Sequence, residues 1–336
     1  MLLFDDIAAE YRDFARYAEG DSPTFADWSA AVAADPDVIA WLATLPPIKH
    51  QPNLVFAAAR LHGVPAPGPY AGLRQALLDD DGPIRETILT HATQTNEVGR
   101  LATLLPVFAQ IAESTARPLA LLEVGASAGL CLYPDRWAYR WRTDSGDVTL
   151  GVAGDPAGEL LCRVKGSGRL PTAMPHIAWR GGIDLNPLDV TDRTVDGDMA
   201  WLRTLVWPEH EDRRARLDHA IAQAQDDPPS LVRGDLLERL PALVDAASAY
   251  GTVVVFHSAV IAYLEPADRD RFEVLIRGLV ADGRCHWVSN EGKNVLPSVT
   301  ATGPEIDPAK QTFVLGLDGR AVAHTHGHGR TLRWCV

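Results

Sequence analysis

Hydrophobic positions divide the chain into two parts with different spacing. Up to about residue 116, apolar residues recur every three or four positions between proline and glycine residues, for example at Val38, Leu42 and Leu45. This spacing puts apolar side chains along one face of a helix. No segment of this part has the alternation of a strand, and the pattern predicts a helical N-terminal cap over residues 1–116.

The pattern changes at Leu119, where short apolar runs begin to alternate with helical segments. Leu119–Val124 is the first such run, and others follow at 177–185, 230–234, 252–257 and 285–289. Short runs of this kind are typical of parallel strands that are buried on both faces. Their alternation with helices predicts that residues 117–336 form a Rossmann-like, doubly wound and mostly parallel α/β sheet.

Two segments depart from this alternation. Between about 139 and 172, glycine-rich turns separate short apolar runs, which predicts a strand-rich insertion in the sheet domain. Between 313 and 334, apolar and polar residues alternate, with Asp318-Gly319 at the position of a hairpin turn. We therefore expect the sheet to end in antiparallel strands.

The composition is that of a globular protein with an excess of acid. Of the 336 residues, 46% are hydrophobic and 22% charged, and the net charge is −13. An acidic surface disfavours nucleic acid and anionic membranes as partners. The longest apolar stretch, 252–264, is shorter than the ~20 residues that cross a bilayer. We expect a small-molecule substrate and no membrane segment, while the oligomeric state stays open.

Cysteine spacing and the first residues bear on the compartment. The four cysteines lie far apart without a C-x-x-C pair, which fits neither a zinc site nor a disulfide framework. The chain begins Met-Leu-Leu-Phe-Asp-Asp and has no basic region followed by a long apolar one, so we expect no signal peptide. Both features favour a cytoplasmic protein with reduced thiols.

Residues 121–130, Leu-Leu-Glu-Val-Gly-Ala-Ser-Ala-Gly-Leu, are the most informative segment. A dinucleotide-binding G-x-G-x-x-G beginning at Gly125 is excluded, because Ser127 and Leu130 occupy glycine positions. The segment matches the G-x-S-x-G nucleophile elbow of hydrolases. It also resembles the first loop of class I S-adenosylmethionine (SAM) methyltransferases, where an acid precedes Gly-x-small-x-Gly. A strand–helix turn without any ligand is a further interpretation.

The resemblance to the methyltransferase loop has a physical basis. Gly125 and Gly129 let the backbone approach the methionine portion of SAM, with Ala126 and Ser127 lining the turn. A helix beginning after the turn favours the carboxylate of the methionine. Glu123, just before the turn, complements the positive charge of the sulfonium.

Three later segments resemble the following methyltransferase motifs in the expected order. Asp184 ends one predicted strand, like the acid that accepts hydrogen bonds from the ribose hydroxyls. Asp235 follows the next strand, like the residue that holds adenine, and the fourth strand ends at His257. All lie at carboxyl ends of strands, where open α/β sheets bind ligands. The resemblance therefore implies cofactor contacts from Glu123, Gly125, Ala126, Ser127, Gly129, Asp184, Leu185, Asp235, Leu236, His257 and Ser258.

The chain as a whole resembles a bacterial family known only as a domain of unknown function. Four segments carry this resemblance, at 94–100 (Gln-Thr-Asn-Glu-Val-Gly-Arg), 123–130, 182–190 and 205–208. Members of that family usually have Asn after the glycine-rich motif, where this chain has Cys131. The family implies a methyltransferase-like fold and no particular substrate.

Candidate catalytic residues lie at the ends of predicted strands. For an acceptor hydroxyl or amine, we expect His257 or Glu291 to take the proton. Methyl transfer from SAM needs no metal. The tract His-Thr-His-Gly-His at 324–328 is interpreted as a polar rim of the pocket, with a three-imidazole metal site as the alternative. Polar residues near the predicted mouth are expected to bind substrate, namely Asn96, Glu97, Arg100, Tyr133 and Tyr263.

Three functions are compatible with these residues. The first is a SAM-dependent methyltransferase that acts on a small-molecule or peptide-like acceptor. The second is a serine hydrolase that uses Ser127 with Asp282 and one of His324, His326 or His328. The third is a methyltransferase-shaped binding protein without turnover. The fourth strand is not followed by Asn-Pro-Pro and an aromatic residue, which argues against methylation of nucleic-acid bases.

Overall fold

The computed structural model describes residues 6–151, 154, 156–195 and 197–335, and it separates into two compact units. We call the first the helical unit; it comprises the chain up to Thr95 together with Thr191–Ala215. The second, the sheet unit, comprises Asn96–Val190 and the chain from Arg216 onward. The segment on which the signal-peptide prediction rested, 1–5, lies outside the described residues.

The helical unit is built from short helices, and it contains no strand among its described residues. Four of its helices begin with proline, which has the φ angle of a first helical position and no N–H to lose there. Its core is aromatic: the rings of Tyr11, Phe25 and Trp28 all contact Phe56 at centroid distances of 5.0–5.9 Å. The helices are α1 (Ile7–Ala18), α2 (Pro23–Ala33), α3 (Pro36–Leu42), α4 (Pro52–Leu61), α5 (Tyr70–Leu78), α6 (Pro83–Thr90) and α8 (Asp198–Leu205), with the 3-10 turn η1 (Pro47–Lys49).

Helix α8 joins this unit from far along the chain. The Arg60 guanidinium donates to the carbonyl oxygens of Thr204 and Val206, at 2.6 and 2.7 Å, just where α8 ends. Glu209 accepts a hydrogen bond from the amide of Thr24 at 2.9 Å. The sequence predicted a helix at 198–205 but assigned it to the sheet domain; that assignment was wrong, because these partners lie more than a hundred residues away.

One sheet runs through the sheet unit. Its eleven strands lie in the order β3-β2-β4-β11-β10-β9-β8-β7-β1-β5-β6, with six parallel and four antiparallel pairings. The strands are β1 (Leu119–Val124), β2 (Ala138–Thr143), β3 (Gly146–Leu150), β4 (Glu159–Lys165), β5 (Ile177–Asp184), β6 (Ser230–Arg233), β7 (Thr252–Ser258), β8 (His286–Gly292), β9 (Phe313–Leu317), β10 (Arg320–Thr325) and β11 (Thr331–Trp334). The predicted α/β class with a mostly parallel sheet is confirmed.

Strands β6, β5, β1, β7 and β8 form a continuous parallel block. Numbered along the chain, this block has the order 3-2-1-4-5, so the direction of winding reverses beside β1. Open α/β sheets bind ligands at such a switch point, outside the carboxyl ends of the strands. The predicted antiparallel end is also present, since β9 pairs with both β8 and β10, and Asp318 and Gly319 have positive φ at the hairpin.

The predicted insertion forms strands β2, β3 and β4, which extend the same sheet. Strand β4 pairs with β2 on one side and with β11, near the end of the chain, on the other. The insertion therefore follows β1 and returns to β5 without an α-helix between them. Positions 152, 153 and 155 of the predicted insertion lie outside the described residues.

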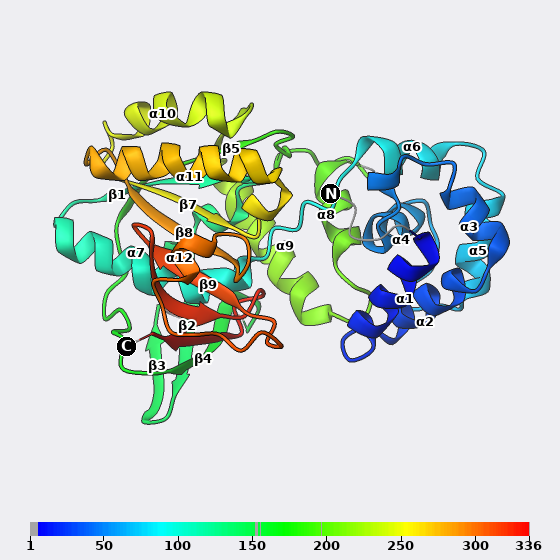
Figure 1. Cartoon of the computed structure of the whole chain (residues 1–336), viewed down its shortest axis with the longest axis horizontal. Helices are drawn as coiled ribbons and strands as arrows, with labels where there is room; N and C mark the ends of the chain where they lie inside the picture. Colours follow the sequence, from blue (N-terminus) through cyan, green and yellow to red (C-terminus); the bar gives the residue numbers. More distant parts are fainter. Residues whose placement is uncertain (1–5, 152–153, 155, 196, 336) are drawn as a thin grey trace. The chain divides into compact units, whose positions relative to one another are not determined.

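Helices cover the two faces of the parallel block. Helices α10 (Leu236–Ala247) and α11 (Pro266–Ala281) lie on one face, and α7 (Leu101–Thr115) lies on the other (Figure 1). The short helix α12 (Pro297–Thr300) packs on β9 and β10. The division of the chain between the two units falls within helix α9 (Glu211–Asp226), after Ala215. The sequence grouped α7 with the N-terminal helices, whereas it packs on the sheet through Phe108, whose ring contacts Phe256 at 5.2 Å.

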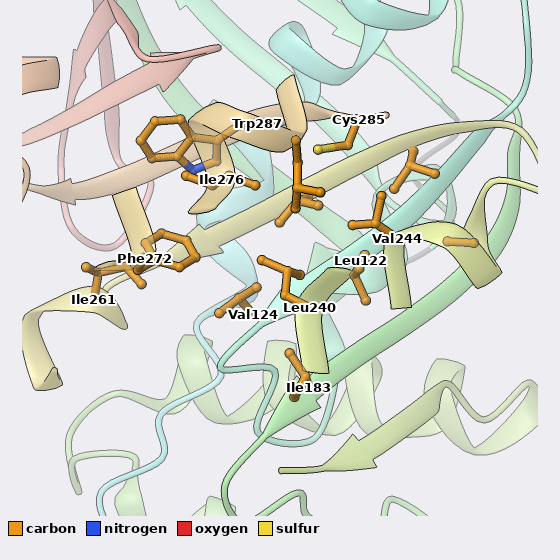
Figure 2. Packing of buried hydrophobic residues seen from close by; sticks show 14 of the residues in the cluster. Leu122, Val124, Ile183, Leu240, Val244, Ile261, Phe272, Ile276, Cys285 and Trp287 are labelled. Atoms are coloured by element: carbon orange, nitrogen blue, oxygen red, sulfur yellow. The ribbon is translucent and has the colours of Figure 1, made fainter. Parts of the chain in front are cut away.

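Alternation along β1 sends successive side chains to opposite faces. Leu122 and Val124 pack among side chains of α10 and α11, such as Leu240 and Phe272 (Figure 2). These side chains are almost completely buried, and each contributes on the order of 1.5–3 kcal/mol to folding. Glu123, between them, therefore points to the α7 face.

No α-helix among the described residues has both the length and the apolar character needed to cross a lipid bilayer.

Candidate functional site

The glycine-rich turn follows β1 at the switch point. Three alternate residues, Gly125, Ser127 and Gly129, have left-handed φ angles of 66, 52 and 70°. The turn leads into two 3-10 turns, η3 (Leu130–Leu132) and η4 (Pro134–Arg136), and not into an α-helix. The expected helix N-terminus is therefore absent from the described chain here, because the strand-rich insertion begins immediately after the turn.

Asn96 holds this turn from the segment before α7. Its side-chain amide donates to the carbonyl of Ala126 at 3.1 Å, and its oxygen accepts from the amide of Leu130 at 2.9 Å. The two bonds connect both ends of the turn to one rigid side chain. We predicted Asn96 as a substrate contact, and the structure shows it as the clamp of the turn.

Asp184 holds the turn from the other side. One carboxylate oxygen accepts from the amide of Ser127 at 2.8 Å, and the other from the amide of Asn186, also at 2.8 Å. The amides of Gly125 and Ala126 donate to the end of β5 as well. Most backbone donors of the turn therefore bond to the protein itself.

The glycines of the turn are needed for close packing. A Cβ atom on Gly125 would collide with the side chain of Val260, and one on Gly129 would lie 2.9 Å from Pro229 and 3.0 Å from Leu132. The turn is therefore closely packed, and most of its backbone amides are not available to a ligand.

Exposed apolar side chains lie near the carboxyl ends of the parallel strands. Leu185 directly follows β5 and is 72% exposed, and Tyr263 lies beyond β7 in η6 (Ile261–Tyr263) and is 75% exposed. Asp235 is exposed after β6, where it caps α10 by accepting from the amide of Leu237 at 2.7 Å, and Leu236 is half-buried. These residues lie at the carboxyl edge predicted for the cofactor.

His257 and Glu291 lie on the face covered by α11. Nδ1 of the fully buried His257 lies 2.7 Å from Oε1 of Glu291, and Trp287 donates its indole N–H to Nε2 at 3.0 Å. Glu291 also accepts from the amides of Val260 and Ile261, so it positions the loop after β7. Both ring nitrogens of His257 are occupied, and its predicted role as a base was wrong.

A separate group of ionisable side chains lies on the α7 face at the carboxyl end of β1. It contains Glu97, Arg100, Glu123, Cys131 and His328, which we call the α7-face cluster. Burial raises the pKa of the Glu123 carboxyl and of the Cys131 thiol; Arg100 counteracts the rise at both groups, whereas Glu123 and Glu97 add to the rise at Cys131. The buried Cys131 thiol also lies 3.7 Å from the carbonyl of Glu97.

Glu123 is the most unusual member of the cluster. It is 5% exposed, and its Oε2 has no hydrogen-bond partner among the residues that the structure describes. Burial raises the pKa of its carboxyl well above the ordinary value, with a further contribution from Asp184. A buried carboxyl in this state favours its neutral form until a cation or donor reaches it.

Arg100 connects two loops around Glu123. Its Nε donates to the carbonyl of Gly327 at 2.7 Å and its Nη1 to the carbonyl of Ser258 at 2.8 Å. Nη2 makes no hydrogen bond within the described part of the chain. The guanidinium thus keeps one donor group for an anion while it holds the ends of β7 and β10 together.

Glu97 and His328 form a pair on the same face, although they are 231 residues apart in sequence. Nδ1 of His328 lies 3.1 Å from Oε2 of Glu97, and the side chains are 28% and 5% exposed, respectively. Because a carboxylate only accepts, this contact assigns the proton to Nδ1 and leaves the lone pair on Nε2. The sequence singled out both residues but gave no signal that they pair.

Two glycines allow this pair to form. A Cβ on Gly99 would lie 2.8 Å from the carbonyl of His328, and one on Gly329 would collide with the carbonyl of Gly99. Gly329 also has a φ of 73°, in the left-handed region. The two backbone segments are therefore in direct contact.

The rings of His326 and His328 are neighbours, with centroids 5.5 Å apart, but His324 lies apart from them on a strand. His324 belongs to β10, whereas His326 and His328 lie in the turn after it, with His326 Nδ1 accepting from the amide of His328 at 3.0 Å. The three rings do not lie on one face of a strand, so the alternative of a three-imidazole metal site at 324–328 loses its geometric basis. Within the described ranges, no three His, Cys, Asp or Glu side chains are grouped so that they could hold a metal ion.

Tyr133 is part of the core and not of the pocket mouth. It is fully buried, its hydroxyl donates to the carbonyl of Asp227 at 2.6 Å, and its ring lies between the guanidinium groups of Arg136 and Arg180. Its predicted substrate contact was wrong, because Asp227, Arg136 and Arg180 enclose it.

The arrangement also contradicts the predicted serine-hydrolase triad. Ser127 follows the carboxyl end of β1, whereas Asp282 precedes β8 at the amino end. Both strands are parallel to β7, so these residues lie at opposite ends of the sheet. Within the tract, Nδ1 of His328 contacts Oε2 of Glu97 at 3.1 Å.

A comparison of the chain with protein-family models gives one match, over residues 8–334. A search of curated proteins finds no match. The match covers both units and all four segments on which the family resemblance rested. The chain belongs to the bacterial family described as "Uncharacterized protein conserved in bacteria (DUF2332)".

Proposed function

We propose that the sheet unit binds S-adenosyl-L-methionine at the switch point beside β1 and transfers its methyl group to a small-molecule or peptide-like acceptor. The observation that carries this proposal is the buried Glu123 carboxyl at the end of β1, next to the left-handed turn, with Arg100 near enough to lower its pKa. Glu123 has an unpartnered buried oxygen, and Arg100 has a donor group without a bond in the described chain. Together they complement the ammonium and carboxylate of an amino-acid moiety.

The strand order supports a nucleoside in the same crevice. With the order 3-2-1-4-5, a ligand at the switch point would lie at the carboxyl end of β1, between the ends of β5 and β7. The exposed Leu185 provides an apolar surface for a flat ring, and Asp235 lies beyond it after β6. Asp184 supports this edge, since it fixes the turn through the amide of Ser127.

Glu123 and Arg100 fit the ammonium and the carboxylate of the methionine moiety, which changes one expectation from the sequence. Because most turn amides bond to the protein, the methionine carboxylate is assigned to Arg100 and not to a helix N-terminus. When bound, SAM supplies a methyl group that its sulfonium already activates. The protein then has to align the acceptor with that methyl group and exclude water.

Calorimetry on the full chain tests the proposal with three nucleosides. We expect SAM and S-adenosylhomocysteine to bind, and 5′-methylthioadenosine, which lacks the amino-acid moiety, to bind at least about tenfold more weakly. Glu123→Gln should reduce the affinity for SAM, whereas Glu113→Gln, at an exposed position of α7, should not. Absence of heat with both SAM and S-adenosylhomocysteine would overturn the proposal.

Turnover needs a separate measurement. Full-length protein incubated with methyl-labelled SAM and a metabolite extract should transfer label to a small molecule or peptide. Tight SAM binding without any labelled product would instead support a methyltransferase-shaped binding protein.

A further inference from the structure

We propose that His328, oriented by Glu97, is the general base of the sheet unit, and that the acceptor therefore presents an O–H or N–H group. This inference rests on the proposed function, since it assigns the proton acceptor for the same reaction. It replaces His257 and Glu291, which are sealed on the opposite face of the sheet.

The geometry of the pair fits a base. The Glu97 carboxylate bonds to Nδ1, so the neutral ring presents the lone pair of Nε2. Nε2 has no hydrogen-bond partner in the described ranges, and 28% of the side chain is exposed. Glu97 is 5% exposed at its side chain, so solvent screens its charge weakly and it stabilises the imidazolium that forms.

Three contacts fix the position of this ring. Gly99 and Gly329 bring their backbones together, and the Arg100 guanidinium holds the carbonyl of Gly327 at 2.7 Å. The amide of His328 donates to the ring of His326 at 3.0 Å. A base on a turn held in this way needs little rearrangement before it accepts a proton.

The same Arg100 places the pair near the proposed cofactor. Its guanidinium lies close enough to Glu123 to lower the pKa of that carboxyl, while its Nε bonds to the residue just before His328. Among the other histidines singled out from the sequence, His257 is enclosed, His324 belongs to β10, and Nδ1 of His326 accepts from the amide of His328. His328 is the ring that combines a buried carboxylate partner with an accessible nitrogen.

The assigned step balances in atoms and charge. The acceptor X–H gives its proton to Nε2 of His328, and the lone pair of X forms the new bond to the methyl carbon. The pair of electrons of the broken carbon–sulfur bond stays on sulfur and neutralises the sulfonium. The imidazolium, paired with Glu97, later returns its proton to solvent. A nucleophile that carries no proton would not need this residue.

Two measurements on the full-length protein test the pair without any acceptor. Nitrogen-15 NMR should show His328 protonated at Nδ1 in the wild type, and this preference should be lost in Glu97→Gln. Diethyl pyrocarbonate, which acylates the unprotonated ring nitrogen, should modify His328 several-fold more slowly in Glu97→Gln. His324 on β10 serves as an internal control with an unchanged rate. An Nε2-protonated His328 in the wild type would overturn the proposal.

A third measurement separates this inference from the proposed function. His328→Gln should bind S-adenosylhomocysteine within about twofold of the wild type but lose methyl transfer by about 10²–10⁴-fold. If the wild type binds no SAM, the proposed function fails while the NMR result still reports on the pair. If SAM binds and His328→Gln transfers methyl groups at the wild-type rate, the base assignment alone is wrong.

Discussion

The indole N–H of Trp287 donates to Nε2 of His257 at 3.0 Å, inside the core beneath α11. This bond requires a lone pair on Nε2 and therefore assigns the ring proton to Nδ1, which faces Glu291 at 2.7 Å. The three side chains form a linear chain of hydrogen bonds, and Glu291 at its end accepts from the amides of Val260 and Ile261 in the loop after β7. A strand-end histidine that resembled a catalytic residue is thus a structural element of the sheet.

Trp287→Phe should destabilise the sheet unit. The change removes the donor and leaves Nε2 of His257 buried and unpaired, which costs about 1–3 kcal/mol. Chemical denaturation followed by circular dichroism measures the free energy of unfolding. Tyr250→Phe, at a position that is 52% exposed, is the control and should change it by less than about 0.5 kcal/mol. Equal stability of both variants would show that the bond to His257 contributes nothing.

Ionisation of Glu123 should make the stability of the free protein depend on pH. Its pKa is raised in the folded state, so the folded protein holds one more proton than the unfolded chain above the ordinary pKa of 4.5. Stability should therefore fall as the pH rises from that value towards the folded-state pKa. Denaturation of wild type and Glu123→Gln between about pH 5 and pH 8 measures this, and the slope should be smaller in the variant.

The same ionisation should couple SAM binding to proton release. A cationic ligand at Oε2 stabilises the carboxylate, so affinity should rise with pH until the free carboxyl is itself ionised. Calorimetry in buffers of different ionisation enthalpy should show release of up to about one proton in the wild type. Glu123→Gln should release less, and an identical value in both proteins would remove Glu123 from the site.

Asn96→Ala should loosen the glycine-rich turn. The carbonyl of Ala126 and the amide of Leu130 lose their partners, which costs about 1–3 kcal/mol of unfolding free energy. We also expect the affinity for SAM to fall, because the turn lies at the proposed SAM site. Asn294→Ala, at an exposed position, serves as the control for both measurements. Wild-type affinity in Asn96→Ala would mean that the turn does not need this clamp to bind.

Gly329→Ala should separate the Glu97–His328 pair. The new Cβ would collide with the carbonyl of Gly99, in addition to the strain of a φ of 73°. Gly283→Ala is a matched control, because Gly283 has a φ of 67° and no atom within 4 Å of the added Cβ. The control should lose about 1–2 kcal/mol from backbone strain alone. Gly329→Ala should lose more, and NMR should show His328 without a fixed proton position.

Local patterns predicted the elements of this protein well. Short apolar runs predicted β1, β5, β6, β7 and β8, and the alternation near the end of the chain predicted the antiparallel hairpin. The sequence also placed the candidate ligand residues at the carboxyl ends of these strands, whereas the order of the strands and the switch point came from the structure. Such patterns succeed because helix and strand periodicities are contained within a dozen residues.

The predicted site was only partly correct, because several of its residues acquire their roles from distant partners. Asn96 was expected to touch substrate and holds the turn, and His257 was expected to take a proton and has both nitrogens occupied. The strand-rich insertion was expected within the sheet domain, and the structure adds that its strand β4 pairs with β11 in the main sheet. Its presence also removed the helix that we expected after the glycine-rich turn.

The amino-acid sequence by itself determined the strand and helix periods, the left-handed glycines, and the side of β1 to which Glu123 points. Only the tertiary structure decided that Glu97 meets His328, that Trp287 closes off His257, and that α8 belongs to the helical unit. Periodicity depends on neighbours along the chain, whereas these pairings depend on strand order and on the direction of side chains from segments far apart. For that reason, the same residues could be singled out in advance, but their partners could not.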